Sequence, residues 1–203
     1  MGVLRKLFGP SKEEVWRQVS SEVGGEYDKG RIFKSDTVKA THGDWTVTLD
    51  IHVVSTGKST VPFTRLRAPY VNPDGFRFDI YRKSIFTGVA KLMGRQDVEV
   101  GYGEFDREFV IKGTDEARLR QLFANPKIRT LLQALPRVHF SVKDDEGWFG
   151  EKFPDGVDEL HFMVAGIIKD PVQLEQLFEL FAETLDELCR IGAAYEGHPQ
   201  VTL

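Results

Sequence analysis

The chain has 203 residues, of which 41% are hydrophobic and 29% charged, and its formal net charge at pH 7 is −4. These values are typical of a globular protein and exclude a disordered chain, a collagen and a coiled coil. Because the chain as a whole is weakly acidic, nucleic acid is not the expected partner. The single cysteine, Cys189, excludes an intramolecular disulfide and a multi-cysteine zinc or iron–sulfur site.

The two ends of the chain read as tails on one folded unit. We expect an N-terminal tail over residues 1–10, a single α+β domain over 11–194 and a C-terminal tail over 195–203. A helix followed by strands occurs twice, so two similar halves, about 11–113 and 114–194, are the alternative. No stretch has the ~20 apolar residues of a membrane span, and the start lacks the apolar region of a signal peptide. We therefore expect a cytoplasmic protein.

The first third of the chain predicts a helix and then a run of strands. Ser11 and Glu14 have the spacing of a capping box, and apolar residues at helical spacing follow until Gly24. Residues 45–53 alternate between apolar and polar, as in a strand with one buried face. Further strands are expected at 38–41, 60–70, 76–80, 97–100 and 109–111. The short turns between them favour antiparallel pairing.

The rest of the chain predicts helices at two places with strands between them. Two short helices, about 115–124 and 126–135, meet at Asn125-Pro126, and strands return at 138–142 and 160–164. The last helix begins at Asp170 and Pro171, has one wide apolar face and ends at Gly192. We therefore predict an α+β fold with a mostly antiparallel sheet, an N-terminal helix, a central pair of short helices and a long C-terminal amphipathic helix packed on the sheet.

Several motif-like segments are better explained as turns. Ser55 to Thr60 resemble the end of a phosphate-binding loop, but His52 stands where that loop needs glycine, and a strand follows. Gly101-Tyr102-Gly103 lacks the third glycine of a dinucleotide site. The histidines show no metal spacing, although His139 and His161 would approach each other if their strands pair. We therefore expect no cofactor and no metal.

Charge is distributed unevenly along the chain. Residues 57–96 hold eight basic and two acidic residues, whereas residues 144–203 hold fourteen acidic and three basic ones. We interpret Arg65, Arg67, Arg77 and Arg82 as a candidate patch that binds an anionic ligand or an acidic protein through bidentate hydrogen bonds. Two alternatives stay open. The basic strands balance the acidic C-terminal part of the same chain, or opposite charges on two copies form a homo-dimer.

A glycine-flanked aromatic segment is a second candidate contact. Trp148, Phe149 and Phe153 lie within residues 147–156. Exposed aromatic rings of this kind can form a binding lip, and the alternative is that they pack back onto their own sheet.

Three short motifs carry a family resemblance. They are Trp16 to Gly25, Phe63-Thr64-Arg65, and the strand-forming stretch 103–113, in which Phe-Asp-x-x-Phe-x-Ile is followed by a helix ending in Leu122-Phe123. In these features the chain resembles a family of uncharacterised bacterial proteins with a Phe-Asp-x-x-Phe-x-Val/Ile strand and a Leu-Phe or Leu-Leu helix. The resemblance implies no activity and no catalytic residue. It draws attention to Asp106, which we expect to cap a turn or pair with an arginine.

The leading hypothesis from the sequence is a non-enzymatic binding or interaction module that recognises an anionic partner. No catalytic residue can be assigned from the sequence. One alternative is a hydrolase-like enzyme with Asp106, Glu104 or the strand histidines as acid–base groups in a cleft. Another is a carrier that holds an apolar ligand between the sheet and the last helix.

Overall fold

The computed structural model contains one antiparallel sheet of eight strands, in the order β1-β2-β3-β4-β8-β7-β5-β6. It describes residues 9–31, 35–55, 57, 59–85, 97–144, 153–201 and 203. The strands are β1 (Glu26–Asp28), β2 (Thr37–His42), β3 (Trp45–Ser55), β4 (Thr60–Val71), β5 (Phe78–Arg82), β6 (Phe109–Gly113), β7 (His139–Lys143) and β8 (Val157–Ala165). The helices are α2 (Lys12–Glu22), η1 (Lys83–Ile85), α3 (Gly103–Glu108), α4 (Glu116–Leu122), α5 (Pro126–Ala134) and α6 (Pro171–Arg190).

The register gives the two faces of the sheet opposite characters. One row across seven strands is entirely apolar: Val38, Leu49, Leu66, Phe162, Phe140, Ile80 and Ile111. The next row is entirely polar: Lys39, Thr48, Arg67, His161, Ser141, Asp79 and Lys112. Because successive side chains of a strand point to opposite faces, the first row supplies the core and the second lies on the other face. We call that second side the open face.

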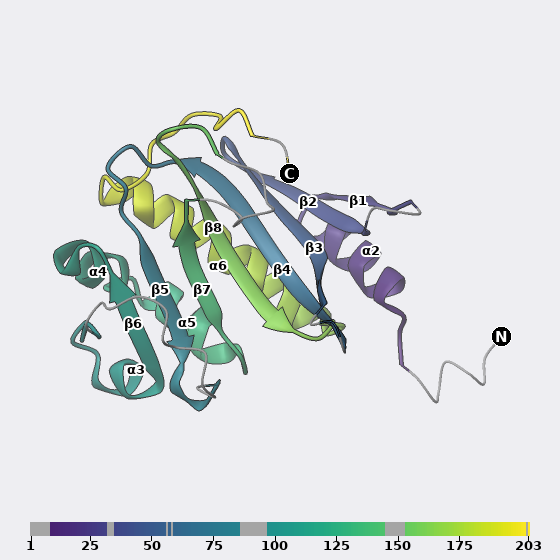
Figure 1. Ribbon diagram of the computed structural model, residues 1–203, viewed down its shortest axis with the longest axis horizontal. Helices are drawn as coiled ribbons and strands as arrows, with labels where there is room; N and C mark the ends of the chain where they lie inside the picture. The colour runs from purple at the N-terminus through teal and green to yellow at the C-terminus, as the bar shows by residue number, and fades with distance from the viewer. Residues whose placement is uncertain are drawn as a thin grey trace.

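The helices pack on the apolar face. In Figure 1 α6 runs behind the sheet with α2 and α5 beside it, and both of these helices contact α6. Phe181 of α6 lies against Phe140, with ring centroids 5.4 Å apart. The indole Nε1 of Trp16 donates a 3.4 Å hydrogen bond to the carbonyl of Ile168, just before α6. One continuous core therefore joins both ends of the sheet.

The helices begin where polar caps are predicted. Ser11 and Glu14 form a reciprocal capping box at α2. Asp115 and Asn125 accept backbone N–H groups at the starts of α4 and α5, and Asp170 does so at α6. These bonds satisfy donors that a helix leaves unpaired in its first turn.

The predicted α+β class is confirmed, with two local differences. Residues 97–100 are not a strand, although the Val98 N–H donates to the Ile111 carbonyl. Residues 103–108 form the short helix α3, whereas the resemblance implies a strand that begins at Phe105, and the strand β6 starts only at Phe109. The cause is Asp106, whose carboxylate accepts the backbone N–H groups of Val100, Gly101 and Tyr102 and so closes the loop into the helix.

The segment after α6 crosses the open face of the sheet. The Tyr195 N–H donates to the Val71 carbonyl, and Lys39 Nζ donates a 2.6 Å hydrogen bond to the main-chain oxygen of Leu203. The residues expected to be a C-terminal tail are therefore attached to β4 and β2. Within the described part of the chain, no helix combines the length and apolar character needed to cross a bilayer.

Candidate functional site

Asp50 and two arginines form the centre of a polar cluster on the open face. Arg65 lies directly opposite Asp50 across the β3–β4 pair, and Arg67 follows two residues later on the same face. Arg65 donates two hydrogen bonds to the Asp50 carboxylate, at 2.9 and 2.8 Å, and Arg67 donates a third at 2.7 Å. Burial alone would raise the pKa of Asp50, but the two guanidiniums outweigh it and hold that pKa below its usual value.

Glu159 on β8 is the most unusual member of this cluster. Its side chain is 0% exposed, and within the described part of the chain neither carboxyl oxygen has a hydrogen-bond partner. Its ion-pair contact there is with Arg67, whose Nη1 lies 4.0 Å from Oε2. Burial raises the pKa of Glu159 to about 7, and the nearby Arg67, Arg65 and Lys143 only partly oppose this. At neutral pH the carboxyl is therefore divided between its protonated and ionised forms.

His161 and Lys143 extend the cluster across β8 and β7. Lys143 is the cross-strand partner of Glu159, and its Nζ lies 3.3 Å from the Nε2 of His161. Burial, assisted by the charges of Lys143 and Arg65, lowers the pKa of His161 well below its usual value. His161 is therefore neutral at pH 7, and its Nε2 can accept a hydrogen bond from the Lys143 ammonium group.

The predicted approach of His139 to His161 occurs only at the level of the strands. β7 and β8 do pair, but His139 Nε2 lies 2.8 Å from Asp79 Oδ1, whereas His161 contacts Lys143. Among the described residues, no group of three or more histidine, cysteine, aspartate or glutamate side chains could hold a metal ion.

The four arginines of the predicted patch do not share one surface. Arg65 and Arg67 share Asp50 on the open face, but Arg77 precedes β5 and donates to the buried Asp158 near the start of β8. Arg82 lies on the helix side, where it donates to the carbonyls of Gln133 and Leu135 and forms an ion pair with Glu108. The position of Arg82 follows from strand periodicity, because it is two residues from the core residue Ile80.

The other sequence candidates divide in a similar way. Trp148 and Phe149 lie outside the described residues. Asp106 is engaged with three backbone N–H groups, which confirms its predicted role as a cap, and Glu104 is exposed. The strand histidines have other partners, since His139 contacts Asp79 and His161 contacts Lys143.

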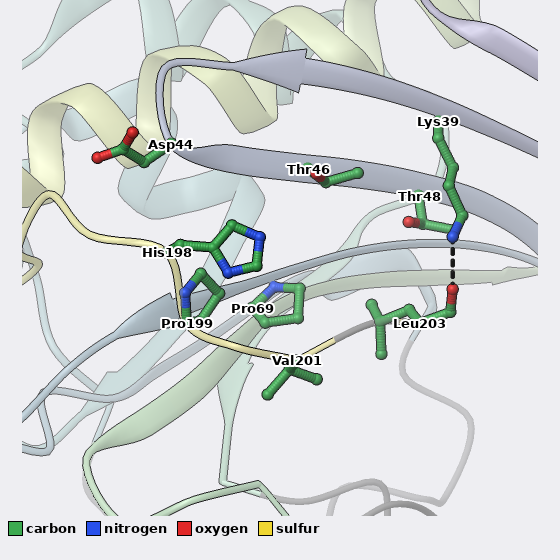
Figure 2. A pocket seen from close by; sticks show the side chains of 9 residues that line it. All are labelled: Lys39, Asp44, Thr46, Thr48, Pro69, His198, Pro199, Val201 and Leu203. Carbon is green, nitrogen blue, oxygen red and sulfur yellow. Dashed lines mark hydrogen bonds between the residues drawn. The ribbon is translucent and has the colours of Figure 1, made fainter.

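Three cavities are described, and each lies at an edge of the sheet or under the final segment. The first, about 160 Å³, lies where that segment passes β2 and β3, between His198 and Pro199 of the segment and Thr46 and Thr48 of β3 (Figure 2). The second, about 230 Å³, lies between β2 and α6 and includes Phe178. The third, about 310 Å³, lies at the β2–β3 turn beside the end of α6. The polar cluster lines none of these three.

The comparisons with known proteins give one likeness in fold. No family model matches the chain, and no curated protein matches it. Among solved structures, the mycobacterial trehalose monomycolate transport factor A, TtfA, aligns with a TM-score of 0.51 over 89% of this chain and 95% of the other. The two sequences are 9% identical, so the likeness concerns the fold alone.

Sequence reasoning found Arg65 and Arg67 but missed Asp50, Lys143 and Glu159 as their neighbours. The available signal was alternation: Glu159 and His161 occupy one face of a strand whose other face carries Leu160 and Phe162. Such alternation predicts which residues share a face. It does not predict which strand lies next to it, because β4 and β8 are far apart in the chain.

Proposed function

We propose that this protein is a non-enzymatic binding module whose ligand carries an anionic group that docks on the open face at Arg65, Arg67 and Lys143. The observation that carries the proposal is the arrangement around Asp50, which holds two guanidinium groups side by side. Lys143 lies on the same face, two strands away from β4. A carboxylate already holds each guanidinium in place, so the side chain loses little further conformational entropy when it binds an oxyanion.

The histidines of this face support the proposal through their electrostatics. Burial lowers the pKa of His161 and of His52, and in both cases the charges of Arg65, Arg67 and Lys143 lower it further. Cations that disfavour a second positive charge at two separate imidazoles also attract an anion.

The side chains of the cluster differ in their exposure to solvent. Arg65 and Lys143 are partly exposed, whereas Arg67, His161 and Glu159 are buried behind them. The two partly exposed cations therefore form the rim that a ligand meets first. The likeness in fold to a protein named as a transport factor also favours binding over chemistry.

A second candidate function is acid–base catalysis by Glu159. A carboxyl with a pKa near 7 can both give and take a proton at neutral pH. Glu159 is 0% exposed, however, so a substrate would have to displace its neighbours before touching it. We rank binding first for that reason.

The test is titration of the purified protein with sulfate, inorganic phosphate and a phosphate monoester by calorimetry. Arg65→Gln combined with Asp50→Asn removes one cation and one anion together, so the net charge of the cluster is kept and Arg67 retains its contact with Glu159. We expect at least one of the three anions to bind the wild type, and the double variant to bind it at least about tenfold more weakly.

The matched control is Arg17→Gln on α2, which removes an exposed cation on the helix side. This control should bind as the wild type does. Failure of all three anions to bind the wild type, or equal binding by the double variant, would overturn the proposal.

A further inference from the structure

Glu159 faces charged groups from each described strand around it. Arg65 and Arg67 act on it from β4, Lys143 from β7 and Asp50 from β3, and His161 lies two residues away on β8 itself. Three of these groups are cations and one is an anion, while His161 is neutral at pH 7. The cations that stabilise the ionised carboxylate of Glu159 are therefore the same ones that we propose bind the anionic ligand.

Arg67 is the physical link between Glu159 and the rim. Its Nη2 donates to Asp50 at 2.7 Å, and its Nη1 lies 4.0 Å from Glu159. One guanidinium thus stands between two carboxyl groups, one tightly bound and one just beyond hydrogen-bond distance. An ionised Glu159 attracts Arg67 and partly cancels the positive charge that a bound anion would meet, whereas a protonated Glu159 does not.

We propose that Glu159 is a positioning residue that couples the binding of an oxyanion on the open face to the uptake of one proton by its own carboxyl. The inference rests on the proposed function, since it concerns the same site. It adds that the ligand group is a phosphate or sulfate type oxyanion and that binding weakens as the solution becomes alkaline.

The sign of the coupling follows from linkage. A bound anion repels the ionised form of Glu159, so binding raises the pKa of this carboxyl above the value of about 7 in the free protein. By reciprocity, protonation of Glu159 strengthens anion binding by the same factor. Affinity is therefore highest below pH 7 and falls as the pH rises through that value.

The experiment uses sulfate, because this dianion does not titrate between pH 6.5 and 8.5. We expect its affinity to fall by about fivefold to twentyfold across this range, as loss of one linked proton dictates. The pKa values of His161 and His52 are lowered from their usual value by burial and by the nearby cations, so both imidazoles are mainly neutral in the free protein at these pH values. Calorimetry at pH 7 in two buffers of different ionisation enthalpy should show uptake of up to about half a proton per sulfate.

Glu159→Gln mimics the protonated carboxyl, and it should bind sulfate at pH 8.5 about as tightly as the wild type does at pH 6.5. Two controls should keep the slope of the wild type. Glu116→Gln removes an exposed carboxyl on α4, and His139→Gln removes the exposed imidazole of the same sheet face.

The outcomes separate the two proposals. No sulfate binding to the wild type at any pH, with no binding of the other anions, would overturn the proposed function together with this inference. Sulfate binding that is equal at pH 6.5 and 8.5 and takes up no proton would overturn this inference alone. If Glu159→Gln does not fold, proton uptake by the wild type at pH 8, where the lowered pKa values of His161 and His52 leave both imidazoles neutral in the free protein, takes the place of the variant, and no uptake there would overturn this inference.

Discussion

Arg65 and Asp50 are direct cross-strand partners in β4 and β3, and the guanidinium binds the carboxylate through two hydrogen bonds of 2.9 and 2.8 Å. The pair is largely buried, with side-chain exposures of 14% and 9%. A second guanidinium, from Arg67, shares the same carboxylate. Removing either sign of charge therefore has a different cost from removing both.

Asp50→Asn should destabilise the protein by about 3–5 kcal/mol, because it leaves two arginines without their shared carboxylate. The double change Asp50→Asn with Arg65→Gln should cost less than Asp50→Asn alone. Urea unfolding monitored by circular dichroism measures both. Equal losses in the single and double variants would show that the ion pair is not the source of the effect.

The Asp50 carboxylate also makes the free energy of unfolding depend on pH in the acidic range. Its pKa is lower in the folded protein than its usual value, so its contribution is present above the unfolded pKa and is lost as the pH falls through the folded pKa. The free energy of unfolding of the wild type should therefore decrease below about pH 4, the usual range of an aspartate. Asp50→Asn should lack this component in the same titration.

Glu159 makes the opposite contribution. Its pKa is raised from 4.5 to about 7 in the folded protein. Its contribution to the free energy of unfolding is therefore fully present below pH 4.5 and is lost as the pH rises through 7. At ~1.4 kcal/mol per pKa unit, this amounts to about 3 kcal/mol by pH 8. Relative to the wild type, Glu159→Gln should therefore gain about that much between pH 4 and pH 8. A constant difference over this range would contradict the raised pKa.

Asp106→Ala should destabilise the protein by about 1–3 kcal/mol, because three backbone N–H groups lose their acceptor. Sulfate binding should be unchanged, since Asp106 lies far along the chain from the open-face cluster and contacts none of its members. Thermal unfolding and calorimetry on the same sample separate the two effects. Weakened binding at unchanged stability would instead support a functional role for this residue.

Phe181→Ala should cost about 3–5 kcal/mol, because it opens a cavity between α6 and Phe140 in the core. Val172→Ala is the matched control on the same helix, since that side chain is 58% exposed. The control should change the free energy of unfolding by less than about 0.5 kcal/mol. Similar losses for the two variants would mean that α6 is not packed as described.

The elements that follow from local patterning were predictable. The capping residues Ser11, Asn125 and Asp170 and the alternation of residues 45–53 depend on neighbours in the chain, and the structure agrees with them. The candidate site depends instead on which strands lie side by side. The sequence predicts that Arg65 and Arg67 share a face, but it does not show which strands lie next to them or where Arg77 and Arg82 find their partners. Asp158, to which Arg77 donates, lies 81 positions away from it.

The pairing of β4 with β8 at the centre of the sheet has a kinetic consequence. Leu66 of β4 pairs with Phe162 of β8, and the described residues between them include β5, β6 and β7 together with α3, α4 and α5. Closing so long a loop costs entropy before its contacts form, and such non-local topologies fold slowly. The antiparallel meander of β2, β3 and β4 needs only short turns, so it can form early. The free edge of β4 is then available to pair with β8. Refolding should accordingly be slow, and it should be slowed further by substitutions that weaken the β4–β8 ladder.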